Sequence, residues 1–136
     1  MKKLATFLLV FTLAFCTLFI GCNKDPLVLK ESDTFVVITA DTDEDLTLIE
    51  YINSLDEYKD MFVIESGMIT SIDGVSNATD WSSCWMIYTS DSEMSNTGWG
   101  EVEYKDNVYG SAILGASELK VKNGCLYIFV YQSFNL

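Results

Sequence analysis

A long apolar run at the amino-terminal end limits what this chain can fold into more than any other feature of its sequence. Lys2 and Lys3 precede a run from Leu4 to Ile20 that is almost entirely apolar. Two lysines followed by such a run are typical of a secretory signal peptide. We therefore predict a signal peptide at residues 1–21. Its removal leaves 115 of the 136 residues, which is enough for one domain with one hydrophobic core.

The apolar run ends in a motif, LFIGC, that resembles the lipobox of bacterial lipoproteins. Its small residue, Gly21, directly precedes Cys22. We predict that Cys22 is lipidated and anchors the protein in the outer leaflet of the membrane at the bacterial cell surface. An uncleaved membrane anchor is the alternative, because the run approaches the ~20 apolar residues that span a bilayer. Both readings place the remaining chain outside the cytoplasm, because the two lysines stay inside.

The chain is strongly acidic. It has 20 Asp and Glu residues against eight Lys, no His, and a formal net charge of -12. Such a surface repels nucleic acid and anionic lipid headgroups, so we expect no nucleic-acid partner and membrane contact only through the lipid on Cys22. Acidity of this kind keeps an extracellular domain dispersed, and cation binding is the alternative reading.

Composition divides the exported part into a tether and a domain. Residues 22–32 contain the only proline and charges of both signs, which predicts a tether between lipid and domain. The domain is predicted at residues 33–136.

Periodicity predicts the secondary structure of this domain. Four apolar residues have the spacing of one helix face: Leu48, Tyr51, Ile52 and Leu55. They predict a helix from Asp43 to Leu55. Runs rich in β-branched and aromatic residues predict strands at Thr34–Ala40, Met61–Ser66, Met68–Ile72, Cys84–Ser90, Glu118–Lys122 and Cys125–Phe134, with a short hairpin around Asp106-Asn107. The expected fold is α+β, with a single helix packed on a mostly antiparallel β-sheet.

Four acidic residues gather at the predicted helix start: Asp41, Asp43, Glu44 and Asp45. Oxygen-rich loops bind calcium, but Leu46 occupies the position of the turn glycine and Ile52 that of the closing glutamate. The favoured interpretation is that these side chains cap free amide groups and meet the positive end of the helix dipole. We predict no metal site.

The residue inventory argues against an enzyme. Without His, the chain cannot build a Ser-His or Cys-His nucleophile or a His metal triad. Paired carboxylates can hydrolyse glycosides, but a domain of about a hundred residues has little room for the deep cleft this needs. We predict no catalytic residues and no required cofactor.

Two further cysteines, Cys84 and Cys125, each stand at the start of a predicted strand. Outside the cytoplasm an even pair predicts a disulfide. Its loop of about 40 residues would contribute on the order of 4 kcal/mol. Two buried thiols are the alternative.

This disulfide would determine which strand faces meet, because side chains alternate across a strand. One face, toward the helix, would carry Trp85, Ile87, Leu126, Ile128 and Val130. The other would carry Met86, Tyr88, Tyr127, Phe129 and Tyr131. An aromatic face is either covered or a binding platform. Cover by residues 91–117 is favoured, with Met94, Trp99 and Tyr109 as the covering residues.

Three motifs, in this order and spacing, resemble the transcobalamin C-terminal-like domain family of bacterial exported proteins. They are GMITSIDGV (Gly67–Val75), CWMIY (Cys84–Tyr88) and KNGCLYIFVYQSF (Lys122–Phe134). The resemblance implies a β-grasp-like arrangement and a ligand-binding or adhesive module. In the vertebrate cobalamin carriers, this domain closes over the corrinoid from one side while a helical barrel supplies the other side. The sequence has no such barrel, so the resemblance only suggests cobalamin.

Two functions of different class follow. The first is a non-catalytic surface lipoprotein that binds a small ligand, with cobalamin or another corrinoid as the candidate, on four aromatic residues: Tyr88, Trp99, Tyr127 and Tyr131. The second is an adhesive module that docks an envelope protein or glycan through the loop from Asp91 to Gly100. The environment of Trp99 discriminates between them.

Overall fold

The structure is a computed structural model that describes residues 26–134 of the chain. The predicted signal peptide and the predicted lipidation site, Cys22, lie outside these residues. Across residues 26–134, no helix combines the length and the apolar character needed to cross a membrane.

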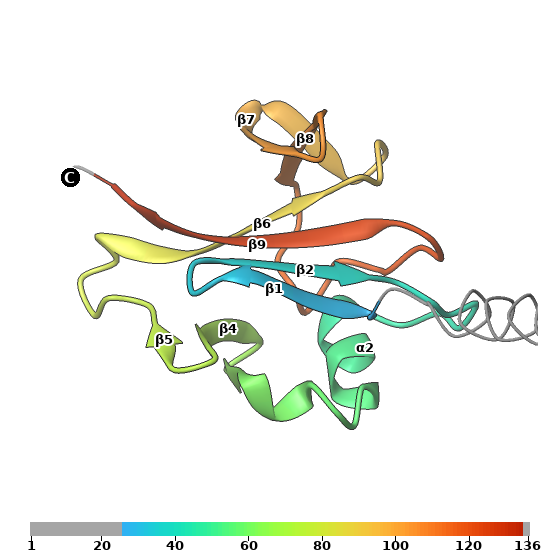
Figure 1. The fold of residues 1–136 in the computed structure, drawn as a ribbon, viewed down its shortest axis with the longest axis horizontal. Helices are drawn as coiled ribbons and strands as arrows, with labels where there is room; N and C mark the ends of the chain where they lie inside the picture. Colours follow the sequence, from blue (N-terminus) through green and yellow to red (C-terminus); the bar gives the residue numbers. More distant parts are fainter. Residues whose placement is uncertain (1–25, 135–136) are drawn as a thin grey trace, which may run out of the picture.

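Six antiparallel strands form the main sheet, in the order β1-β2-β9-β6-β8-β7 (Figure 1). Their bounds are β1 (Val28–Ser32), β2 (Phe35–Thr39), β6 (Ser83–Thr89), β7 (Ser95–Tyr104), β8 (Asn107–Ala112) and β9 (Leu126–Ser133). The last strand in the chain, β9, therefore lies inside the sheet between β2 and β6.

The segment between β2 and β6 forms the layer below the main sheet. It consists of α2 (Leu48–Ser54), the 3-10 helix η1 (Lys59–Met61), and a smaller antiparallel sheet of β3 (Phe62–Glu65), β4 (Met68–Ile72) and β5 (Val75–Ser76). In Figure 1, α2, β4 and β5 lie below the main sheet and the β7–β8 hairpin lies above it. One short helix with antiparallel sheets confirms the predicted α+β fold.

The first core lies between the main sheet and this lower layer. The predicted helix face is confirmed, because Leu48, Tyr51 and Ile52 are buried. They pack in one cluster with residues of β2, β9 and the small sheet, including Ile38, Phe129, Phe62 and Ile72. Because burial of apolar surface is the main favourable contribution to folding, this cluster holds the two layers together.

A second core lies on the upper face of the main sheet, around Val37, Tyr88 and Ile128. The β7–β8 hairpin covers it with three partly buried side chains: Val102, Tyr104 and Tyr109. On this same upper face, Tyr104 reaches from the β7–β8 hairpin to β1 and β2. Its ring stacks on Phe35 at 5.7 Å, and its hydroxyl donates to Glu31 Oε1 at 2.9 Å.

The predicted cover is therefore present, but only one of its three predicted residues is right. Tyr109 packs on the second core, whereas Met94 packs against the first core. Trp99 is 66% exposed. The hairpin turn lies one residue earlier than predicted, at Lys105-Asp106, where both residues have positive φ.

Three predicted segments differ from the structure by more than one residue at an end. Part of the predicted tether, Val28–Ser32, is strand β1, because it pairs with β2. The helix begins at Leu48 rather than Asp43, because Thr47 caps it. The predicted strand at Glu118–Lys122 makes only an isolated bridge between Lys120 and Thr47. The backbone of this segment instead forms a hydrogen bond with the start of the helix, in which the Leu48 N–H donates to the Leu119 carbonyl.

The predicted disulfide between Cys84 and Cys125 is wrong, and both are free and half-buried. Strands β6 and β9 run antiparallel, with Cys84 opposite Gln132. Gln132 lies seven residues after Cys125, which corresponds to roughly 23 Å along a strand. The two thiols therefore lie near opposite ends of the strand pair.

The antiparallel register also corrects the predicted sheet faces. Trp85 and Ile87 do face the helix, but the β9 residues opposite them are Tyr131 and Phe129. Residues directly opposite each other share a face, so the aromatic residues of β9 join the first core. Leu126, Ile128 and Val130 lie on the upper face.

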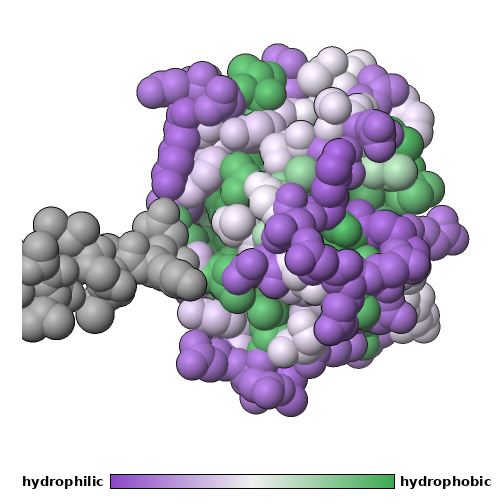
Figure 2. Space-filling model, turned by 90° about the vertical axis from the view of Figure 1, so that its right-hand side faces the viewer, coloured by the Kyte–Doolittle hydropathy of each residue, from purple (hydrophilic) through white to green (hydrophobic). Residues whose placement is uncertain are grey.

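Hydrophilic residues occupy much of the molecular end seen in Figure 2, with smaller hydrophobic areas between them. Four acidic residues precede α2: Asp41, Asp43, Glu44 and Asp45. They do not cap the helix as predicted, and Asp45 instead pairs with Lys120 at 3.3 Å.

Candidate functional site

Three of the four predicted ligand-binding aromatics have structural roles. Tyr127 is fully buried and its hydroxyl accepts a hydrogen bond from the Lys122 N–H at 2.7 Å. Burial raises its pKa. Tyr88 is buried on the opposite face and donates to Gln132 Oε1 at 2.7 Å. These two rings lie on different faces of the sheet, so they cannot contact one ligand.

Tyr131 and Trp99 complete the predicted set, and they are also apart. Tyr131 packs on Trp85 at 5.4 Å and donates to the Ser76 carbonyl at 2.9 Å, below the sheet. Trp99 lies on the edge strand β7, in a bulge between Asn96 and Glu101. The structure therefore does not bring the four predicted residues together.

A cleft of about 280 Å³ lies beside the edge of β6 that faces away from β9. β6 pairs with β9 from Ser83 to Thr89, but it pairs with β8 only at Tyr88 and Thr89. Within the described chain, the first residues of β6 thus have no strand on this side. We call this opening the Trp81 cleft. It is lined by Ser66, Gly67, Met68, Ile69, Asn77, Trp81, Cys84, Trp85, Ile87, Gly115, Ala116, Ser117 and Phe129.

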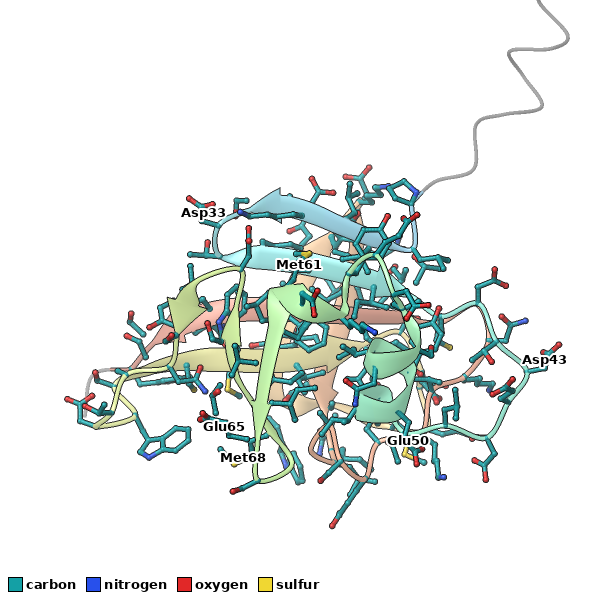
Figure 3. All side chains as sticks on the ribbon, turned by 90° about the horizontal axis from the view of Figure 1, so that it is seen from below. Asp33, Asp43, Glu50, Met61, Glu65 and Met68 are labelled. Atoms are coloured by element: carbon teal, nitrogen blue, oxygen red, sulfur yellow. The ribbon has the colours of Figure 1, made fainter. Side chains whose placement is uncertain are left out.

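One wall of the Trp81 cleft is the tight turn between β3 and β4. Ser66 and Gly67 both have positive φ, as in the type I′ turns that suit a two-residue hairpin. A Cβ at Gly67 would lie 3.2 Å from the Cβ of Ser117, so the turn packs closely on the opposite wall. Figure 3 shows Glu65 and Met68 beside this turn, at the opposite edge of the molecule from Asp33.

The rim carries Trp81, which is 51% exposed and has a φ of 62°. A left-handed backbone is rare for a bulky residue and costs of order 1 kcal/mol or more. The surrounding turn holds this conformation. The Ser82 backbone N–H and hydroxyl both donate to Asp80 Oδ1, at 3.0 and 2.6 Å, and these bonds lower the Asp80 pKa. The indole is therefore presented at the cleft by a structured turn.

The base of the cleft is held by a hydrogen-bonded network around Asn77. Its Oδ1 accepts from the Trp85 backbone N–H at 2.8 Å, and its Nδ2 donates to the Ile69 carbonyl at 3.1 Å. The Trp85 indole N–H donates to the Val75 carbonyl at 2.8 Å. These bonds tie β6 to the small sheet. The cleft is consequently formed before any ligand binds, which lowers the ordering cost of binding.

Cys84 is the one thiol among the lining residues. Burial raises the pKa of its thiol, and its sulfur lies 3.8 Å from the Met86 sulfur. The thiolate is the reactive form of cysteine, and the raised pKa disfavours it. Over residues 26–134, no three His, Cys, Asp or Glu side chains form a group that could hold a metal ion. The arrangement of the cleft is suited to binding an apolar group.

Sequence reasoning missed both exposed apolar residues of this cleft, Met68 and Trp81. Met68 was assigned to a strand, which is right, but its 44% exposure depends on the turn beside it. A usable signal did exist for Trp81, because this lone aromatic lies in a polar segment, NATDWSS. Trp99 has the same signal, because it is also an aromatic residue in a polar segment.

Residues 45–108 match the model of a family described as a domain of unknown function (DUF4430). This range contains α2, the small sheet, β6 and Trp81. No curated protein and no solved structure matches the chain.

Proposed function

We propose that the protein is a non-catalytic surface module that binds a small organic ligand in the Trp81 cleft. The observation that carries the proposal is Trp81, half-exposed and held in a left-handed conformation over a preformed apolar opening. Strained residues that persist in a folded protein cluster at functional sites. The volume, about 280 Å³, is at the lower end for small-molecule pockets.

The anchor belongs to the same proposal. Lipid on Cys22 would hold the protein in the outer leaflet at the bacterial cell surface. Only five residues separate Cys22 from the first residue of β1, Val28. An extended chain covers at most about 3.6 Å per residue, so the domain would lie within roughly 20 Å of its anchor. A Cys22→Ser variant should then leave the membrane fraction.

A corrinoid remains the named candidate, supported by the resemblance to the transcobalamin C-terminal-like domain. A corrin ring system is larger than the cleft, so only an edge or a side chain of it would enter. Small aromatic and aliphatic compounds fit the opening better. The ligand screen therefore contains cobalamin, cobinamide and a set of such small compounds.

The test is thermal unfolding of the full-length protein, followed by intrinsic fluorescence, with each compound of the screen. A ligand at a hundredfold its Kd adds about 2.7 kcal/mol to the free energy of unfolding and raises Tm. We expect Trp81→Ala to abolish the shift. The matched control is Trp99→Ala, which removes an exposed indole outside the cleft. A wild-type Tm that no compound moves, or a shift that survives Trp81→Ala, contradicts the proposal.

The exposed bulge supports a second candidate function, docking of an envelope protein or glycan. Trp99 is 66% exposed on the edge strand, and Gly98 and Gly100 flank it. Trp is enriched at binding hot spots. Co-purification from solubilised envelopes should lose its partners in Trp99→Ala but keep them in Trp81→Ala.

A further inference from the structure

Acidic residues adjoin the residues that line the Trp81 cleft. Glu65, Asp80 and Glu118 each directly precede or follow a lining residue, and all three are exposed. No lysine lines the cleft in the described chain. Four described lysines are engaged elsewhere: Lys30 with Asp33 and Asp73, Lys59 with Asp56, Lys120 with Asp45, and Lys105 over the Tyr104 ring.

The position of Glu65 follows from strand pairing. It lies opposite Met68 across the β3–β4 pair. Residues directly opposite each other in an antiparallel pair share a face, with Cβ atoms about 4.5–5.5 Å apart. Met68 lines the cleft, and Figure 3 shows Glu65 near Met68, so we place Glu65 beside the cleft. A ligand that enters past Met68 therefore meets this negative charge.

Asp80 and Trp81 form the other side of the rim. Hydrogen bonds from Ser82 fix the Asp80 carboxylate and lower its pKa, so it is ionised at neutral pH. The face of an indole attracts cations through its quadrupole, more strongly than any other side-chain ring. An aromatic ring next to a carboxylate that hydrogen bonds hold in place, at an apolar cleft, is complementary to one chemical class.

We propose that the ligand of the Trp81 cleft is an organic cation, an ammonium group on a small apolar body. This rests on the proposed function and names its ligand class. The apolar body occupies the space between Ile69, Ile87 and Phe129, and the ammonium group lies between Trp81 and Glu65. A neutral ligand lacks the contacts of the ammonium group with Trp81 and Glu65. An anion is repelled by the carboxylates of Glu65 and Asp80.

Three probes with one phenyl body and different charge test the inference: 2-phenylethylammonium, 2-phenylethanol and 3-phenylpropionate. Binding to the full-length protein is measured by isothermal titration calorimetry at low and high salt. We expect the ammonium to bind roughly tenfold or more tightly than the alcohol, the anion not to bind, and salt to reduce the difference.

Two variants locate the charge contact. Glu65→Gln should weaken the ammonium several-fold and leave the alcohol unchanged. Glu101→Gln is the matched control, because Glu101 is an exposed carboxylate on β7 that, unlike Glu65, adjoins no lining residue of the cleft. Equal affinity of ammonium and alcohol, a Glu65→Gln variant that keeps the wild-type preference, or no binding of the ammonium overturns the inference. A neutral or anionic hit in the thermal screen that requires Trp81 would still support the proposed function.

Discussion

At the scale of single residues, the hairpin turns depend on positive φ angles. Ser66-Gly67, Asp73-Gly74 and Lys105-Asp106 each have two successive residues in the left-handed region. This is the type I′ geometry, whose twist matches that of the flanking strands. Glycine adopts this region without the steric cost that a Cβ brings. Asp73-Gly74 is the turn that joins β4 to β5, next to the cleft wall.

We expect Gly74→Ala to lower the free energy of unfolding by about 1 kcal/mol, measured by urea denaturation. Gly74 has a φ of +83° and no atom within 4 Å of the position of a Cβ, so the cost comes from the backbone alone. Gly115→Ala is the control, because Gly115 has equally open space and no positive φ. Equal stability of Gly74→Ala and the wild type would contradict this explanation.

At the scale of elements, α2 is too short to be stable by itself. Its seven residues are well below the length at which isolated helices form in water. Two features compensate: the buried face in the first core and a capping box at the start. The Glu50 N–H donates to Thr47 Oγ1 at 3.2 Å, and the Thr47 N–H donates to Glu50 Oε2 at 2.7 Å.

Removal of the cap should destabilise the protein. Thr47→Ala is expected to lower the free energy of unfolding by about 1 kcal/mol at pH 7, measured by urea denaturation. Thr97→Ala is the control, because Thr97 is an exposed threonine outside the helix. A Thr47→Ala variant as stable as Thr97→Ala would contradict the role of the cap.

The capping box also gives a pH dependence of known sign. The hydrogen bond from the Thr47 backbone lowers the pKa of Glu50 below its ordinary value. The unfolded state therefore binds the proton more readily, and stability rises with pH across this range. The Glu50 contribution is present above the ordinary Glu pKa of about 4.3 and is lost as the pH falls through the lower folded value. The stability difference between the wild type and Glu50→Gln should accordingly shrink in acid.

At the scale of the whole molecule, local patterns were predictable and non-local register was not. The helix face and the strands β2, β3, β4, β6 and β9 follow from apolar periodicity within one segment. Which strands pair, and in which direction, depends on distant segments. The assumed cysteine contact therefore placed Tyr127 and Tyr131 on the wrong face.

The candidate site, like the strand pairing, depends on contacts between segments that are distant in the sequence. The Trp81 cleft needs the β3–β4 turn, the start of β6 and residues 115–117, which are brought together only by the fold. Periodicity within one segment cannot show that an edge of β6 is left open. Composition predicts the docking alternative for Trp99, whose indole is exposed, but not the favoured covering role.

The antiparallel pairing of β6 with β9 leads to a prediction about redox state. Cys84 and Cys125 lie at opposite ends of the pair, so no disulfide can join them without unfolding the sheet. We expect a reducing agent to leave Tm unchanged. A bond closing a loop of about 40 residues would contribute on the order of 4 kcal/mol, so its reduction would lower Tm by many degrees.

Alkylation of the unreduced, denatured protein provides the direct measurement. Mass spectrometry should find one added group on each of the peptides that contain Cys84 and Cys125. A disulfide that joins the two peptides without alkylation, together with a Tm that falls in reductant, would contradict the strand register itself. The experiment therefore tests the arrangement of the main sheet, because a parallel β6–β9 pair would bring the two cysteines to the same end.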